Sequence, residues 1–158
     1  MDKHTHNKQY AFHHYVSYAP LMVFVVALAG IMIHYFVWNI SILDGGLIQV
    51  LGFILVVLSP FLLLWSQRAR IKLYDNEKIL NFNFPKGPYQ FSRHPSYLAL
   101  VLILLGLAFL LNSMLMLLLV IGFFFFFSLV WIPKEEHMLN HYYPKNYTQY
   151  KKKVRMWL

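Results

Sequence analysis

The chain of 158 residues has no cysteine and few charged residues. The missing cysteine excludes disulfide bonds, thiolate nucleophiles and cysteine-ligated zinc. Asp and Glu number only 6, and charged residues make up 13% of the chain, about half the share usual in soluble domains. Hydrophobic residues make up 59% and aromatic residues 18%. These proportions indicate a membrane protein, and the length predicts a single domain, residues 1–158.

Four apolar segments contain no Asp, Glu, Lys or Arg, and each approaches the length of about 20 residues that a bilayer crossing requires. They are residues 18–38, 47–65, 95–111 and 114–132. The sequence therefore predicts an all-α, multi-pass membrane protein with four transmembrane helices. The remaining parts are an N-terminal arm (1–17), a long loop (66–94) and a C-terminal tail (133–158).

The distribution of positive charge predicts the orientation. All 14 Lys and Arg residues lie in the arm, the long loop or the tail, whereas the short links Asn39–Gly46 and Asn112–Ser113 contain none. Cytoplasmic loops of membrane proteins carry an excess of Lys and Arg. Both termini and the long loop are therefore predicted to be cytoplasmic.

The tail has the pattern of an amphipathic helix. Apolar and aromatic residues recur at steps of four and three: Tyr143, Tyr147, Tyr150, Val154 and Trp157. With basic residues beside this stripe, we expect an interfacial helix in the plane of the lipid headgroups. Pro144 is predicted to divide it into two parts.

Two polar clusters border the last two apolar segments. Arg93-His94-Pro95 precedes the third, where proline favours a helix start and the free N–H groups attract anions. Glu135-Glu136 follows the fourth. Since the third and fourth segments form a hairpin, we expect His94 and Glu135 to face each other. The acidic pair is interpreted either as a binding site, since carboxylates beside hydrocarbon are costly, or as a solvated helix end neutralised by Lys134 and nearby arginines. A cationic helix start facing two acids suits a zwitterionic cofactor and an amphiphilic substrate.

Residues 86–154 contain several elements that together resemble the isoprenylcysteine carboxyl methyltransferases and their phospholipid N-methyltransferase relatives. These elements are Gly87-Pro88-Tyr89, Arg93-His94-Pro95, Tyr97, Glu135-Glu136 and the tail residues Tyr147, Tyr150, Lys153 and Val154. The resemblance implies an S-adenosylmethionine-dependent methyltransferase that binds its cofactor at the cytosolic face. It implies a lipidic acceptor that enters from the bilayer, with membrane lipids as partners and no nucleic acid.

The resemblance also implies roles for individual residues. The cofactor-binding residues would be Tyr89, His94, Pro95, Tyr97, Leu98, Glu135 and Glu136. The catalytic residues would be Glu136, Lys153 and Arg93, with Lys153 near the acceptor carboxylate. Three positions depart from the family's pattern: Ala99 and Pro144 stand where glycine is usual, and Trp131 stands where an arginine often occurs. Ala99 is expected to narrow the cofactor pocket, and Trp131 removes a counter-charge.

The acceptor stays open at this point. A carboxylate, as in a prenylcysteine, is already a nucleophile at neutral pH, so positioning suffices. A phospholipid amine needs a base, for which His94, Glu135 and Glu136 are candidates. A membrane NADPH-dependent lipid or sterol reductase and a non-catalytic membrane subunit or small transporter are the alternative functions.

No metal is expected. His137 and His141 share a helix face, but no third ligand accompanies them apart from the glutamates. The histidines of the N-terminal arm are interpreted as part of an exposed, mobile segment: His4, His6, His13 and His14.

Overall fold

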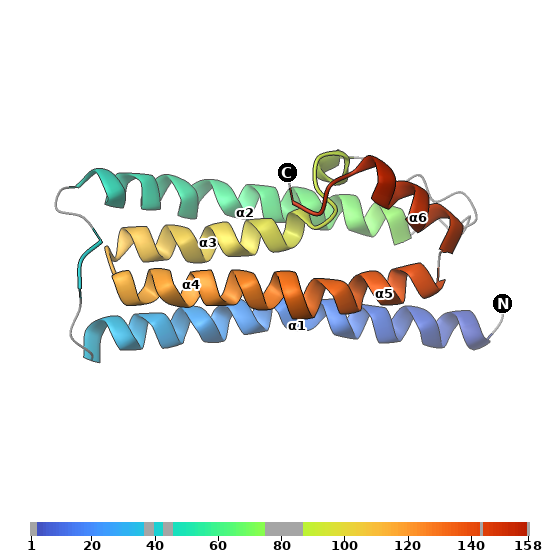
Figure 1. Cartoon of the computed structure of the whole chain (residues 1–158), viewed down its shortest axis with the longest axis horizontal. Helices are drawn as coiled ribbons and strands as arrows, with labels where there is room; N and C mark the ends of the chain where they lie inside the picture. The colour runs from blue at the N-terminus through green and yellow to red at the C-terminus, as the bar shows by residue number, and fades with distance from the viewer. Residues whose placement is uncertain (1–2, 37–39, 43–45, 75–86, 143, 158) are drawn as a thin grey trace.

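The computed structural model describes residues 3–36, 40–42, 46–74, 87–142 and 144–157; for 3–17, 70–74, 142 and 146 it describes the backbone alone. The described residues form helices and no strand, which confirms the all-α class. The long helices lie along the longest axis of the molecule (Figure 1). In chain order the elements are α1 (Lys3–Phe36), α2 (Leu47–Tyr74), the 3₁₀ turn η2 (Gly87–Gln90), α3 (Pro95–Leu110), α4 (Met114–Phe126), the π-helical turn η3 (Phe127–Trp131), α5 (Ile132–Tyr142) and α6 (Pro144–Lys153).

Three of the described helical stretches are long and apolar enough to cross a membrane: Tyr18–Phe36, Leu47–Ala69 and Met114–His141. The fourth predicted span, α3, is apolar but has 16 residues. It is therefore roughly 24 Å long at 1.5 Å per residue, shorter than a hydrocarbon core of about 30 Å. Its crossing of the membrane stays a prediction.

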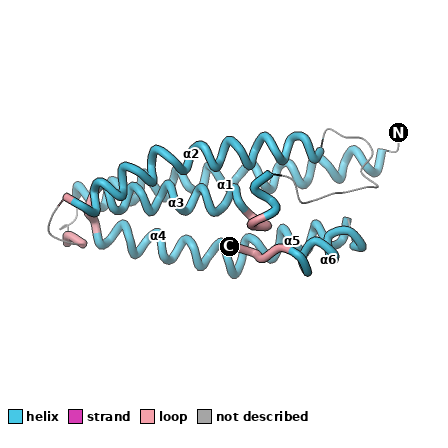
Figure 2. The backbone as a smooth tube through the Cα atoms, turned by 90° about the horizontal axis from the view of Figure 1, so that it is seen from above, coloured by secondary structure: helices cyan, strands magenta, loops and turns pink. Residues whose placement is uncertain are grey.

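Consecutive helices from α1 to α4 run antiparallel, and α1 and α3 run in the same direction (Figure 1). Helix α2 packs on α3, α3 packs on α4, and α1 packs on both α4 and α3. The start of α1, the end of α2 and helix α6 lie at the same end of the bundle (Figure 1). Viewed from above, α4 and α5 form one continuous rod with α6 beside α5 (Figure 2). The bundle thus brings to one end the segments that carry the charges.

The turn between α3 and α4 has the geometry of a tight hairpin. Asn112 adopts a positive φ of 49°, a left-handed conformation that asparagine tolerates at a helix end. Ser113 then caps α4, since its side chain accepts a hydrogen bond from the Met116 amide. The Asn112 side chain also accepts from the Ile42 amide at 3.0 Å. These contacts explain how two residues suffice to reverse the chain.

Two glycines allow α2 and α3 to approach closely. A Cβ placed on Gly106 would lie 2.9 Å from the backbone nitrogen of Val56, and one on Gly52 would lie 2.7 Å from the Gly106 carbonyl oxygen. Both distances are shorter than real Cβ contacts allow. The small residues therefore fix the spacing of this helix pair, as is common at helix contacts in membranes.

Two helices extend beyond their predicted ends. Helix α1 already begins at Lys3, so the backbone of the predicted arm is helical rather than irregular. Helix α2 continues through Tyr74 into the predicted loop. Residues 75–86 of that loop lie outside the described part of the chain. Apolar content marks where lipid contact ends, but a helix continues as long as its backbone hydrogen bonds are satisfied.

Candidate functional site

The start of α3 is held in place by the turn before it. Gly87 has a φ of +63°, a conformation that glycine adopts without strain. Pro88 and Tyr89 of η2 are buried, and the amides of Phe91 and Ser92 donate to the Pro88 carbonyl oxygen. His94 then occupies the N-cap position of α3, followed by Pro95, as predicted from the Arg-His-Pro order.

Ser92 connects this turn to the end of the chain. Its buried hydroxyl donates to the Met156 carbonyl oxygen at 3.0 Å and accepts from the His94 amide at 3.2 Å. The Arg93 amide donates to the Arg155 carbonyl oxygen at 3.0 Å. The C-terminal segment therefore runs beside residues 92–93 and restrains the backbone that carries Arg93 and His94.

The acidic pair lies on α5, just after the π-helical turn η3. Pro133 lacks an N–H and its ring crowds the carbonyl one turn earlier, which accounts for a widened turn at this place. Such π turns are frequent at functional sites. Glu135 and Glu136 lie beyond the apolar stretch that ends at Ile132. Glu135 is 3% exposed.

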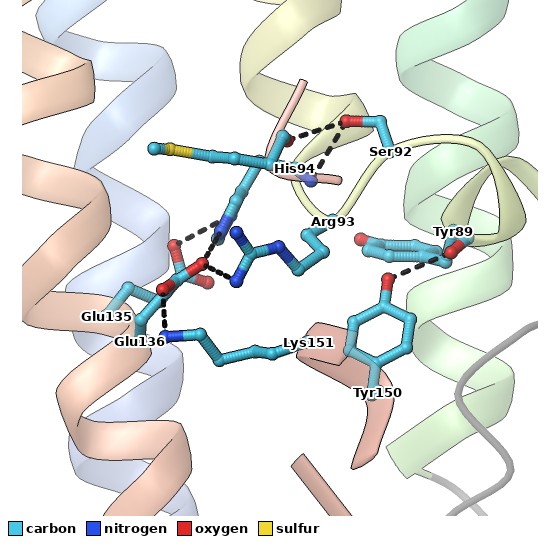
Figure 3. A network of polar contacts seen from close by, with 9 residues as sticks. Tyr89, Ser92, Arg93, His94, Glu135, Glu136, Tyr150 and Lys151 are labelled. Carbon is cyan, nitrogen blue, oxygen red and sulfur yellow. Dashed lines mark hydrogen bonds and ion pairs between the residues drawn. The ribbon is translucent and has the colours of Figure 1, made fainter. Parts of the chain in front are cut away.

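The cluster Arg93-His94 contacts the acidic pair, as expected from the hairpin of α3 and α4. Arg93 Nη1 lies 2.6 Å from Glu136 Oε1, and His94 Nε2 lies 3.3 Å from the same oxygen. The second oxygen, Oε2, lies 2.8 Å from Nζ of Lys151 on α6. Glu136 thus stands among three nitrogen-bearing side chains from two separate segments (Figure 3). Glu136 is not a solvated helix end, since it is only 12% exposed, but an arginine does pair with it, as that alternative expected.

This environment keeps Glu136 ionised. Burial by itself raises the pKa of this carboxyl, but the hydrogen bonds of His94 and Lys151 and the charge of Arg93 outweigh burial and lower the pKa to about 2. The neighbouring tyrosines respond in the opposite direction. Burial raises the pKa of Tyr147 and Tyr150 far above the usual phenol range, and the charge of Glu136 raises the pKa of both further. The two tyrosines therefore stay neutral.

Buried polar atoms remain for a ligand to contact. Glu135 Oε2 lies 3.8 Å from His94 Nδ1, beyond hydrogen-bond range. Among the described residues this oxygen has no hydrogen-bond partner, and neither does Arg93 Nε. The Glu135 oxygen can accept a hydrogen bond from an ammonium or hydroxyl group of a ligand, and the Arg93 N–H can donate one to a carboxylate. One zwitterionic molecule can provide both groups. Partnerless buried polar groups are costly, so this pair fits a binding site better than a purely structural contact.

Aromatic side chains pack beside His94. The rings of His94 and Tyr97 stack with centroids 5.7 Å apart. The Trp131 indole donates to the Tyr97 hydroxyl at 3.2 Å. Trp131, where the family pattern often has an arginine, is therefore packed in the core at 8% exposure. Ala99 is fully buried on α3.

The other predicted residues lie at different depths around this cluster. Pro95 is fully buried, and Leu98 is half-buried with its amide donating to the His94 carbonyl oxygen. Tyr89 is buried, and its carbonyl oxygen accepts from the Tyr150 hydroxyl at 2.9 Å. Lys153 is exposed at the end of α6, and among the described residues no ion pair joins it to the cluster.

The tail contributes to the site in a way that the sequence did not predict. Tyr147, Tyr150 and Val154 of the apolar stripe are buried by the chain itself. The stripe therefore packs on the protein, whereas the pattern predicted contact with headgroups; Tyr143 lies outside the described residues. The break at Pro144 is confirmed, since α5 ends at Tyr142 and α6 begins at Pro144.

Two residues of the cluster were missed. Lys151 appeared in the sequence as one of several basic residues beside the stripe, and Ser92 had no motif of its own. The only signal for Lys151 was its place one residue after Tyr150, on a helix whose other face is apolar. In the part of the chain that the structure describes, no group of three His, Asp or Glu side chains gathers to hold an ion. The side chains of the histidines in residues 3–17 lie outside that part.

The model of the phospholipid methyltransferase family matches residues 45–146. The chain belongs to the phospholipid methyltransferase family. Neither the curated proteins nor the solved structures contain a match to it.

The family match includes α2 to α5, and with them Arg93, His94, Glu135 and Glu136. Membership of the phospholipid methyltransferase family implies a methyltransferase and, with three apolar helices, an integral membrane protein. It favours this function over a membrane reductase or a non-catalytic subunit. Residues 147–158, which carry Lys151 and the segment beside Ser92, lie outside the match.

Proposed function

We propose that the protein is an S-adenosylmethionine-dependent methyltransferase that methylates a lipidic acceptor at the cytosolic surface of a membrane. The observation that carries the proposal is the convergence of Arg93 and His94 with Glu135 and Glu136 at one buried place. In this proposal α3 completes a four-helix membrane domain, and both termini are cytoplasmic, in keeping with the distribution of Lys and Arg.

The chemistry of the residues fits this cofactor. S-adenosylmethionine has a carboxylate, an ammonium and a sulfonium, and so needs both cationic and anionic partners. Arg93, His94 and the N-terminus of α3 would hold the carboxylate, because donors and a helix N-terminus favour anions. Glu135 and Glu136 would hold the ammonium or the ribose hydroxyls. Tyr89, Pro95, Tyr97 and Leu98 would line the remaining surface.

When bound, the cofactor supplies an electrophilic methyl group on its sulfonium. The residues of this chain would contribute positioning and the exclusion of water, effects large enough for such a transfer. Glu136 is a poor general base, since its pKa of about 2 lies far below neutral pH. Its part is therefore that of a fixed negative charge.

For the acceptor we propose the carboxylate of a prenylcysteine-like lipid. A carboxylate needs no base, in keeping with the low basicity of Glu136. The exposed Lys153 would attract the acceptor's negative charge from the headgroup region. The exposed apolar residues of α4 and η3 would let the lipid tail stay in the bilayer during transfer: Leu118, Ile121, Phe125, Phe126 and Leu129.

A phospholipid amine is the second candidate, favoured by the family match and by the buried carboxylate of Glu135. In this case the acceptor nitrogen loses a proton, and Glu135 or His94 would accept it. Because Glu136 is unsuited to that role, the two acids would have separate functions.

The test is methyl transfer from radiolabelled S-adenosylmethionine, catalysed by the purified protein in lipid nanodiscs. A prenylcysteine analogue, phosphatidylethanolamine and a native lipid extract are offered in parallel. Label in the prenylcysteine analogue supports the first candidate, and label in phosphatidylethanolamine supports the second. Label in no lipid, together with no binding of S-adenosylmethionine in calorimetry, overturns the proposed function.

A further inference from the structure

Lys151 has an unusual position among the lysines of the tail. Its ammonium lies 2.8 Å from Glu136 Oε2 and 5.8 Å from the centre of the Tyr147 ring. Its side chain is 41% exposed, whereas that of Glu136 is 12% exposed. The lysine thus reaches from the surface to a buried carboxylate (Figure 3).

The carboxylate side chains of the cluster equal its Arg and Lys side chains in number. Apart from His94, it contains the two carboxylates of Glu135 and Glu136 and the two cationic side chains of Arg93 and Lys151. S-adenosylmethionine has a net charge of +1, since its sulfonium and ammonium outnumber its carboxylate. Its entry leaves one uncompensated positive charge in a partly buried site, where charges are screened little. Balance returns when one resident cation leaves.

The two resident cations differ in how firmly they are held. Arg93 is 12% exposed, and its backbone is tied to the Arg155 carbonyl oxygen. Lys151 is more exposed and carries its charge on a flexible four-carbon stem. Among the residues that the structure describes, its one ion pair is with Glu136. Lysine regains hydration readily when it turns to solvent. Lys151 is therefore the cation that the structure allows to leave.

We propose that Lys151 is a displaceable counter-ion. Its ammonium forms an ion pair with Glu136 until the positively charged cofactor binds and displaces it. This inference rests on the proposed function, because it takes S-adenosylmethionine as the ligand. It assigns a role to a residue outside the family match, on the terminal helix α6. Lys151 is a positioning residue in this account, since it acts on the cofactor through Glu136.

The exchange reverses after methyl transfer. The S–CH₃ bond breaks with its electron pair staying on sulfur, and a lone pair of the acceptor forms the new bond to carbon. The sulfonium becomes a neutral thioether, so the product S-adenosylhomocysteine has no net charge. The site then contains one positive charge fewer, and the return of the Lys151 ammonium to the site favours product release.

The first test compares Lys151→Met with the control Lys152→Met, whose lysine is exposed on the next residue of α6. Calorimetry in nanodiscs measures binding of S-adenosylmethionine and S-adenosylhomocysteine. We expect Lys151→Met to bind S-adenosylmethionine about tenfold more tightly than the unchanged protein, as removal of one competing charge interaction predicts. The gain for S-adenosylhomocysteine should be smaller. Weaker binding in Lys151→Met, or binding equal to that of Lys152→Met, overturns the proposal.

A second test uses the unchanged protein and does not depend on a variant that folds. Acetylation by acetic anhydride followed by mass spectrometry reports how accessible each lysine is. S-adenosylmethionine carries a sulfonium, and its analogue sinefungin carries an ammonium in the corresponding place. Both should raise the labelling of Lys151 several-fold relative to Lys152. S-adenosylhomocysteine should raise it less. Unchanged or lower labelling of Lys151 with bound S-adenosylmethionine rejects the exchange, whereas absence of any binding rejects the proposed function itself.

Discussion

Arg93 and Glu136 form an ion pair of 2.6 Å between Nη1 and Oε1, and each side chain is 12% exposed. The pair joins the residue before the N-cap of α3 to α5, so it connects the two arms of the helical hairpin at the site. Each partner makes the burial of the other acceptable, because a lone charge at this depth is costly.

Removing one partner of this pair should be strongly destabilising. In Glu136→Gln the guanidinium of Arg93 and the ammonium of Lys151 lose their counter-charge, at a cost of about 3 kcal/mol. The measurement is thermal unfolding of the protein in detergent. Lys134→Met, at an exposed position of the same helix, serves as the control and should unfold near the temperature of the unchanged protein. Equal unfolding temperatures for the two variants would contradict this role of Glu136.

The effect of Glu136 on stability should depend on pH in one direction only. The pKa of the folded carboxyl is about 2, below the value of 4.5 for the free group. A lowered pKa contributes stability that is fully present above pH 4.5 and is lost as pH falls toward 2. The difference in unfolding temperature between the unchanged protein and Glu136→Gln should therefore be constant from pH 5 to pH 8 and shrink below pH 4.5. A difference in unfolding temperature that grows on acidification would show that folding raises the pKa of Glu136 instead of lowering it.

Ser92→Ala should loosen the connection between the start of α3 and the C-terminal segment. The change removes a buried hydroxyl that serves both the His94 amide and the Met156 carbonyl oxygen, with an expected loss of about 2 kcal/mol. Hydrogen exchange of the His94 amide should rise as well. The matched control is Ser128→Ala, because the buried Ser128 hydroxyl has no hydrogen-bond partner among the described residues. A similar loss in both variants would argue against a special role of Ser92.

Gly106→Ala tests the close approach of α2 and α3. The added methyl group would meet the backbone of Val56 at 2.9 Å, so the helices must separate, at a cost of about 1–3 kcal/mol. Gly122→Ala on α4 is the control, since a Cβ there meets nothing within 4 Å. Gly122→Ala should leave stability unchanged or raise it, because alanine favours helix more than glycine does. Thermal unfolding of both variants decides the point, and a loss limited to Gly122→Ala would contradict the packing argument.

Much of the fold followed from patterns that act locally. Long runs without charge predicted helices, and the Asn112-Ser113 link predicted a hairpin; both are confirmed. Helix ends were less predictable, as the extension of α1 to Lys3 and of α2 to Tyr74 shows. Polarity marks the border of lipid contact, and it does not end a helix whose backbone groups remain bonded to one another.

The site could be predicted in part for the same reason. The neighbours Arg93-His94 and Glu135-Glu136 stand at the two ends of one hairpin, so chain geometry alone brings them together. Trp131 and Lys151 were different. The sequence does not distinguish a tryptophan at the membrane interface from one in the protein core. In the structure Trp131 is buried and donates a hydrogen bond to Tyr97. Nor does spacing distinguish Lys151, which contacts Glu136, from Lys153, which is exposed.

By itself the amino-acid sequence determined the class of the protein, the helical hairpin and the meeting of its two polar ends, because hydrophobicity and chain connectivity act without reference to distant segments. Only the tertiary structure decided which lysine of the tail reaches Glu136 and that the aromatic stripe packs inward. Those outcomes depend on the rotation and position of α6 against η2 and α5. Contacts between separate segments set that rotation, and no local pattern encodes it.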